Sequence, residues 1–438
     1  MVRLRLLKAL LWTLRESIWG MHVIEENGYD RNELLAVLNE ASQDSQLLNF
    51  GFWLSGWKEE FEKLNLTRGS RRLAEILESP IFSIFNDRIF YSGNGGSTVN
   101  IGLLSKWLAI RTIQAGAEEA VSGLLKLVEL EEKPELDILL LSGVRISREY
   151  HIDGWFKLVP LSSIWKYSID HFDRYLSHSR EIFQSTIPTA ALITVRRVST
   201  SIEPSRAALD RLTLDYANQD LFWLTLGLVC AGEAPTPMAR WNLLPSWAPF
   251  SGILDSGYSS RMEIKHPKSE NSLGDTEIEH AIKLHQSLKA LPPNIIRPLT
   301  ICLNRLNQSV NTWDLVQQAI DLGVALEAVL TPSENTDQLS FQFRLLGALL
   351  VGDTQDERLL AYDIFKSFYT LRSKAVHNGE LPTKSIQISG MGKLTPREVL
   401  IEATRLGRLA VIKLIERGGI APDEYASFIL SSGDRYQN

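Results

Sequence analysis

The chain has 438 residues, of which 44% are hydrophobic and 22% are charged, and its formal net charge is −6. This composition is that of an ordinary globular protein and excludes an intrinsically disordered chain. The length predicts two to three domains. The acidic balance argues against a protein that coats nucleic acid nonspecifically.

Residues 1–132 are predicted to be mainly helical. Apolar residues recur with the period of a helix in Glu33–Ala41, Arg71–Leu77 and Ala117–Leu130. A glycine-rich segment, Tyr91–Thr98, interrupts this pattern. It has neither the lysine of a Walker loop nor the G-x-G-x-x-G order, so we interpret it as a turn between elements rather than a phosphate cradle.

The pattern changes to strands at Asp137. Three short runs, Asp137–Ser147, Trp155–Ser162 and Ala190–Ser199, are rich in β-forming residues and separated by turn residues. The polar segment Ser251–Asp275, rich in glycine and serine, is predicted as a linker or loop. We therefore expect residues 1–270 to form a mixed α/β sensor or regulatory region, strand-containing over 137–270.

No segment of the sequence predicts a membrane span. The longest nearly apolar run, Leu221–Ala231, is too short to cross a bilayer and predicts a core helix. A helical stripe near the N-terminus is formed by Leu4, Leu7, Leu11, Leu14 and Ile18. Nearby basic residues interrupt it, which favours a packing helix over a signal peptide or a membrane-surface helix. We expect a cytoplasmic protein with no membrane partner.

No metal or cofactor site is predicted. Cys230 and Cys302 lie far apart in apolar surroundings, as buried thiols of a reducing compartment do. No CxxC pair or Cys/His cluster suggests zinc. His280 and His285, five positions apart on a predicted helix, make a poor metal pair. We therefore expect neither a metal nor a cofactor.

The segment Tyr362–Gly379 predicts one amphipathic helix with an arginine on its apolar stripe. Arg372 follows Phe365 and Phe368 at helical spacing, and Ala375 or Val376 continues the stripe. A guanidinium there is costly unless it is paired or the stripe lines a site. Asn378-Gly379 is a helix stop signal, which puts His377 in the last turn.

The spacing of Arg372 and His377 means little by itself. With four to six intervening residues allowed, the same pattern occurs at Arg15/His22, Arg145/His151 and Arg261/His266. Five helical residues separate the Cα atoms of Arg372 and His377 by about 7.5 Å, so the two side chains can converge on one phosphate-sized group. Alternatively, His377 caps helix carbonyls and Arg372 pairs with a carboxylate.

Four segments in order resemble the C-terminal domain of the Apea-like HEPN family over residues 299–417. Asn304–Asn307 resembles its "R-L-N" helix, and Ala319–Leu330 resembles its "D-L-G-I-A-L-E-A-L-L" helix. Phe368–Gly379 resembles its "Y-x-x-R-S-x-x-V-H-G" helix end, and Pro396–Arg417 fits its last helix. One difference is Asn378, which stands between His377 and Gly379 and shifts the helix cap by a residue.

The resemblance implies an all-α HEPN helical bundle, which we place at 271–438, and a metal-independent endoribonuclease. Arg372 would hold the scissile phosphate and stabilise its developing charge. His377 would act as general base or acid on the ribose 2′-OH or the leaving 5′-oxygen, leaving a 2′,3′-cyclic phosphate and a 5′-OH. A homodimer would bring a second histidine to the RNA.

Other residues near this pair have two interpretations each. Glu327 is the only charged residue between Leu322 and Leu330: it either supports Arg372 or His377, or faces solvent. Ser373 and Asn378 can hydrogen-bond a phosphate or cap the helix. Lys374 either attracts RNA or is solvated. From Thr354 to Arg417, 11 Lys and Arg face 7 Asp and Glu, a balance of +4 that suits a site for phosphates.

Two classes of function therefore remain open. The first is an RNA-cleaving effector of antiviral defence or toxin-like growth arrest, held in check until the N-terminal region senses an unknown trigger. The second is a non-catalytic HEPN interaction or nucleotide-binding module, as some HEPN bundles are. A third, in which the N-terminal region is itself an enzyme, has no nucleophile, metal or cofactor motif to support it.

Overall fold

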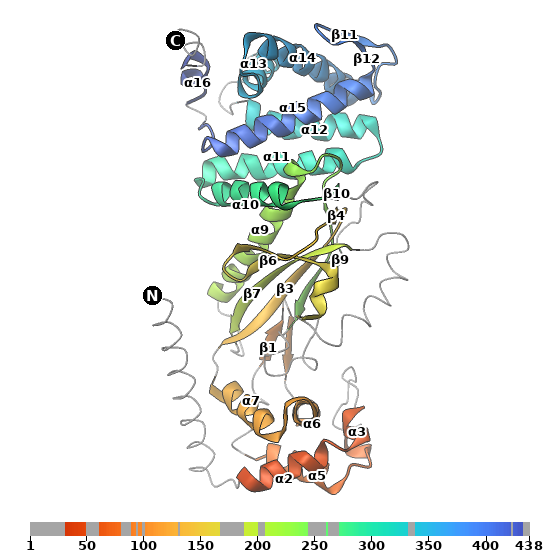
Figure 1. Ribbon diagram of the computed structural model, residues 1–438, viewed down its shortest axis with the longest axis vertical. Coiled ribbons are helices and arrows are strands. Elements are labelled where there is room, and N and C mark those ends of the chain that lie inside the picture. Colours follow the sequence, from red (N-terminus) through yellow and green to blue (C-terminus); the bar gives the residue numbers. More distant parts are fainter. Residues whose placement is uncertain are drawn as a thin grey trace.

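The chain is arranged in three layers along its long axis (Figure 1). A group of helices occupies the N-terminal end, a β-sheet lies in the middle, and a helical bundle occupies the C-terminal end. This confirms the predicted order of a mixed α/β region followed by a helical region. The computed structural model describes residues 31–49, 61–79, 89–92, 95–98, 101–129, 132–166, 188–199, 206–243, 260–261, 271–331, 338–421 and 424–431.

The N-terminal layer packs helices around one apolar core. Its described helices are α2 (Arg31–Ala41), α3 (Ser45–Leu48), α5 (Arg68–Leu77), α6 (Ile101–Ala115) and α7 (Ala117–Glu129). Three of them, α2, α5 and α7, contain the stripes that the sequence predicts. The expected stripe at Leu4, Leu7 and Leu11 lies outside the described residues.

The glycine-rich segment Tyr91–Thr98 is more than the turn that we expected. Strands β1 (Ile89–Ser92) and β2 (Gly95–Thr98) pair antiparallel, with Ser92 opposite Gly95. Much of the glycine-rich sequence is therefore paired backbone. Glycine is a poor strand former, so the local pattern concealed the second strand.

The middle layer is a six-stranded sheet in the order β5-β6-β7-β3-β8-β9. Its strands are β3 (Glu132–Ser142), β5 (Tyr150–Asp153), β6 (Phe156–Pro160), β7 (Ala190–Ser199), β8 (Thr236–Leu243) and β9 (Ser260–Arg261), and η2 (Leu161–Lys166) follows β6. The three predicted strand runs are confirmed. Alternate residues of β3 enter different cores: Leu139 and Leu141 lie on one face, and Ile138 and Leu140 on the other.

The segment Ser251–Asp275, expected to be a linker, contains elements tied to the sheet region. Strand β9 pairs with β8, and β10 (Asn271–Ser272) pairs parallel with β4 (Val144–Arg145). Asn271 Nδ2 also donates to the carbonyl oxygens of Gly143 and Glu233. The residues between these strands lie outside the described part of the chain.

Helix α9 (Arg206–Val229) joins the sheet to the bundle. Phe222 and Leu226 belong to the core on one face of the sheet, whereas Leu221, Leu224 and Leu228 belong to the core of the bundle. The predicted core helix at Leu221–Ala231 is thus confirmed. Because one helix supplies side chains to both cores, the sheet and the bundle are packed together rather than joined only by a linker.

The bundle contains α10 (Asp275–Lys289), α11 (Pro293–Asn311), α12 (Leu315–Leu330), α13 (Leu339–Val351), α14 (Gln355–Asn378) and α15 (Pro396–Glu416), with α16 (Tyr425–Ser431) at one side. In the described part of 271–438, the structure departs from the expected all-α domain at β10 and at a hairpin, β11 (Ile386–Ile388) with β12 (Gly392–Leu394). Gly390 and Gly392 adopt positive φ angles in its turn region, which glycine does without steric cost. Buried Ile388 anchors the hairpin in the core of the bundle.

No helix in the part of the chain that the structure describes is long and apolar enough to cross a membrane. The same described residues contain no group of three or more His, Cys, Asp or Glu side chains placed to hold a metal ion.

Candidate functional site

Helix α14 has well-defined ends that fix the positions of Arg372 and His377. Thr354 caps the first turn: its hydroxyl accepts from the Glu357 N–H, and the Glu357 carboxylate accepts from the Thr354 N–H. At the other end Gly379 adopts φ 70°, and its N–H donates to the Ala375 carbonyl oxygen. The predicted stop at Asn378-Gly379 is confirmed, and His377 lies in the last turn.

Arg372 points inward, toward α12. Its Nη2 atom donates to Oε2 of Glu327 at 2.6 Å, and the side chains are 22% and 25% exposed, respectively. The guanidinium carbon also lies 5.9 Å from the centre of the Tyr369 ring. Of the two interpretations of Glu327, the structure supports the one in which it pairs with Arg372.

The Glu327 carboxylate is held in a partly desolvated position. Burial raises the pKa of Glu327 above its ordinary value, and the positive charge of Arg372 only partly offsets that effect. The short hydrogen bond and the raised pKa thus point in opposite directions. The geometry defines the pairing, and the raised pKa reflects the desolvation of the carboxylate. Arg372 Nε is also buried and has no hydrogen-bond partner among the described residues.

Gly323 allows this approach of the two helices. A Cβ atom at position 323 would lie 2.5 Å from Cγ of Arg372 and 3.1 Å from its Nε. The stem of the arginine therefore rests on the bare backbone of α12, one turn before Glu327. Gly323 was not among the predicted site residues. Its signal was a glycine inside an apolar helix, which costs about 1 kcal/mol relative to alanine and so indicates a packing reason.

His377 points elsewhere. A separation of five residues places it about 140° around the helix from Arg372, and its side chain is exposed whereas Arg372 is half-buried. The structure thus brings Arg372 to Glu327 but not to His377, because one chain directs the two side chains to different surfaces. No hydrogen bond or ion pair joins Arg372 to His377 in the described part of the chain, and their convergence on one phosphate stays a prediction.

The supporting residues stay close to the helix end. Ser373 is half-buried, whereas Lys374 and Asn378 are exposed. Within the described part of the chain, no hydrogen bond or ion pair engages the side chains of Ser373, Lys374, His377 or Asn378. These groups are therefore available to a ligand or to solvent, and the cap of α14 is made by Gly379 instead.

Two other segments of the bundle, Asn304–Asn307 and Ala319–Leu330, are held in place by polar contacts. Arg305, from the segment Asn304–Asn307, donates to buried Asp321 of α12 at 3.1 Å, and Gln317 donates to the other oxygen of that carboxylate at 2.9 Å. Asn307 donates to the Leu224 carbonyl oxygen of α9. These residues hold α11 against α12 and α9, and they lie outside the Arg372–Glu327 pair.

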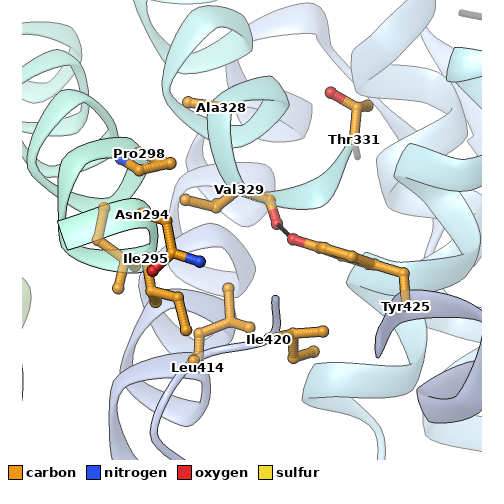
Figure 2. Close-up of a pocket in the computed structure, with 11 residues that line it drawn as sticks. Asn294, Ile295, Pro298, Ala328, Val329, Thr331, Leu414, Ile420 and Tyr425 are labelled. Atoms are coloured by element: carbon orange, nitrogen blue, oxygen red, sulfur yellow. Dashed lines mark hydrogen bonds between the residues drawn. The ribbon is translucent and has the colours of Figure 1, made fainter. Parts of the chain in front are cut away.

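A small cavity of about 80 Å³ lies near the C-terminal end of α15 (Figure 2). Tyr425 closes one side, and its hydroxyl donates to the Val329 carbonyl oxygen at 2.6 Å. Burial raises the pKa of Tyr425 to about 12. Because ligand pockets usually enclose about 300–1,000 Å³, this cavity is too small for a nucleotide and is separate from the Arg372 site.

Buried histidine and cysteine side chains are not part of a site. His285 packs edge-on against Phe222 and Phe156, and burial lowers its pKa to about 4. Cys230 and Cys302 are both buried free thiols, as expected.

Comparisons with protein-family models, curated proteins and solved structures found no match to this chain.

Proposed function

We propose that the protein is a metal-independent endoribonuclease of HEPN type whose active site is completed by a second copy of the chain. The observation that carries the proposal is the Arg372–Glu327 pair beside an exposed, unpartnered His377 at the end of the same helix. Glu327 orients the guanidinium, while His377 is left accessible to RNA.

The chemistry requires two proton transfers. The ribose 2′-oxygen attacks phosphorus as its proton passes to a base, and the 5′-oxygen leaves as it takes a proton from an acid. The products are a 2′,3′-cyclic phosphate and a 5′-OH. A neutral His377 serves as the base and a protonated His377 of a second copy as the acid. A guanidinium stabilises the charge on the non-bridging oxygens.

A homodimer is part of the proposal because one chain separates the two groups. Val376 lies one turn beyond Arg372 on the same side of α14, and 46% of its surface is exposed. A two-fold contact over the last turn of α14 would cover Val376 and bring His377 of one copy toward His377 of the other, with Arg372 one turn earlier on the same helix. We also propose that residues 1–270 regulate the activity, in antiviral defence or growth arrest, in response to an unidentified trigger.

The coupling between the regions supports such regulation. Arg408 of α15 donates to the carbonyl oxygens of Cys230 and Gly232, just after α9, at 2.7 and 2.6 Å. Asn311 of α11 donates to the Ala234 carbonyl oxygen and accepts from its N–H. A shift of the α9–β8 connection would thus be transmitted to two helices of the bundle.

A second candidate function is a non-catalytic, nucleotide-binding or interaction module. It is favoured by the fact that Arg372 is already paired with Glu327 in its own chain while His377 faces another direction. In this case the Arg372 pair is structural, and His377 contributes at most to binding.

Cleavage of RNA by the purified full-length protein in EDTA tests these functions. Wild type is compared with His377→Ala and Arg372→Lys. The control is His280→Ala, which removes a half-buried histidine of α10 that lies 3.4 Å from Glu416 in the same bundle. We expect wild type and His280→Ala to leave cyclic phosphate ends, and the other two variants to be inactive while remaining folded and dimeric.

Cleavage by His377→Ala at the wild-type rate would exclude the assigned site. No cleavage by any of these proteins, together with RNA binding that requires His377 or Arg372, would favour the non-catalytic module. Sedimentation of the wild type as a monomer under conditions in which it cleaves would exclude the shared site.

A further inference from the structure

A second feature of α14 is an open groove on its outer side, between the helix and the segment that leads into β11. Its volume is about 450 Å³, within the range of ligand sites. Three lysines line it: Lys366 and Lys374 from α14, and Lys384 from the segment before β11. The hairpin that closes this side of the bundle is visible beyond the end of α14 in Figure 1.

The groove is positively charged without local compensation. No acidic side chain lines it, and in the described part of the chain none of its lysines forms an ion pair. Asp363 and Glu380, the nearest acidic residues along α14 and its end, are not among the lining residues. A protein with a net charge of −6 thus concentrates positive charge in one groove, where it attracts anions.

The other lining groups are suited to phosphate oxygens. Four hydroxyl side chains, Ser367, Thr370, Thr383 and Ser385, stand among the lysines. The Thr370 hydroxyl donates to the Lys366 carbonyl oxygen, so the other three remain to donate to a phosphate. Lysine and hydroxyl groups are frequent partners of nucleic-acid phosphates. No aromatic side chain lines the groove, so it offers no surface on which a base could stack. This chemistry fits a sugar–phosphate backbone rather than the bases.

His377 lies at the end of the same helix face. Lys366, Thr370 and Lys374 are separated by four residues each, and His377 follows three residues later, so these side chains share one side of α14. All are exposed. From Lys366 to His377 the face is about 16 Å long, the length of several stacked nucleotides at about 3.4 Å each.

We infer that this groove binds the phosphate backbone of single-stranded RNA, independently of sequence, and leads the strand to His377. The groove lies between one face of α14 and the segment that leads into β11, so its lysines reach a strand from both sides. Binding to the groove does not require cleavage; only the statement that the strand is delivered to a catalytic His377 rests on the proposed function.

The test measures binding with an RNA that cannot be cleaved. The probe is a fluorescent 2′-O-methyl oligoribonucleotide of about ten nucleotides, a length in the usual range of single-strand sites. Full-length wild type is compared by anisotropy, over a range of salt concentrations, with the triple variant Lys366→Gln/Lys374→Gln/Lys384→Gln. The control triple variant, Lys283→Gln/Arg297→Gln/Lys413→Gln, removes the same charge from α10, α11 and α15.

We expect the groove variant to bind at least about tenfold more weakly at low salt. Each lost phosphate contact reduces the slope of log K against log salt by about 0.7, so the slope should fall by about 2. The control variant should keep most of the affinity, and Lys366→Arg/Lys374→Arg/Lys384→Arg should bind like wild type. Because the three lysines are at the surface, thermal unfolding should be nearly unchanged.

The inference is overturned if wild type does not bind the probe, if the groove variant binds it as wild type does, or if the control variant loses as much affinity. The proposed function fails separately. If the groove variant loses binding and no form of the protein cleaves RNA, the groove inference stands and the ribonuclease proposal is wrong. If the groove variant binds as wild type does and His377→Ala abolishes cleavage, the ribonuclease proposal stands and the groove inference is wrong.

Discussion

Replacement of Gly323 by alanine tests the packing that positions Arg372. The new Cβ would lie 2.5 Å from Cγ of Arg372, and 3.1 and 3.3 Å from its Nε and Cδ. Cγ belongs to the stem of the side chain, which is tethered to the backbone of α14 and cannot swing away freely. Either Arg372 changes rotamer and releases Glu327, or α12 and α14 move apart.

The expected size of the effect follows from three contributions. Alanine in place of glycine inside a helix stabilises by about 1 kcal/mol. Loss of a hydrogen bond between charged groups costs about 1.5–3 kcal/mol, and overpacking at the contact costs a further 1 kcal/mol or so. Gly323→Ala should therefore destabilise the wild type by about 2 kcal/mol. In an Arg372→Ala background the long arginine side chain is absent, and Gly323→Ala should stabilise the protein by about 1 kcal/mol.

The assay is a double-mutant cycle of four full-length proteins: wild type, the two single variants and the double variant. Because a chain with several layers need not unfold in one step, urea unfolding is combined with amide hydrogen exchange of peptides from α12 and α14. The two backgrounds should differ by about 3 kcal/mol in the effect of Gly323→Ala. An equal stabilisation in both backgrounds would show that Arg372 does not rest on Gly323.

Three further perturbations have defined outcomes. Burial raises the pKa of Glu327, so the protonated carboxyl is favoured in the folded state relative to the unfolded state. Protonation of Glu327 therefore stabilises the fold below the ordinary pKa of 4.5, and this stabilisation is lost as the pH rises through the raised pKa of the folded state. Glu327→Gln should flatten that decline in a series of unfolding curves, and an unchanged pH profile would contradict it. Arg408→Ala should lower the free energy of unfolding by about 2 kcal/mol, because two charge-assisted hydrogen bonds to carbonyl oxygens between α9 and β8 are lost. Arg408→Lys, which lacks the planar guanidinium, should recover part of the loss. Wild-type stability of the alanine variant would show that these hydrogen bonds do not hold α15 against the α9–β8 connection. Burial raises the pKa of Cys230 to about 12 and raises that of Cys302 as well, so a thiol reagent at mildly alkaline pH should modify neither until the protein is unfolded; rapid modification of the native protein would show that these thiols are accessible.

Local sequence signals predicted the ends and types of many elements. The helix over Pro396–Arg417 is present as α15, with Thr395 accepting from the Glu398 N–H as its N-cap. The stop at Asn378-Gly379 and the strands after Asp137 were also readable, because caps, turns and alternation depend on residues within a few positions of one another. The hairpin β11–β12 was missed, since its two strands have only three residues each and weak alternation.

The sequence by itself determined that α14 carries an arginine on its apolar stripe and a histidine in its last turn. It also marked Glu327 as an isolated charge on an apolar helix, but left its partner open. Only the packing of α12 against α14 decided that Glu327 pairs with Arg372, across 45 positions of the chain. Packing and the helical period together direct His377 to the opposite, lysine-lined side. The physical reason is that helix formation is a local equilibrium, whereas the pairing and exposure of these groups depend on the close approach of two helices over Gly323.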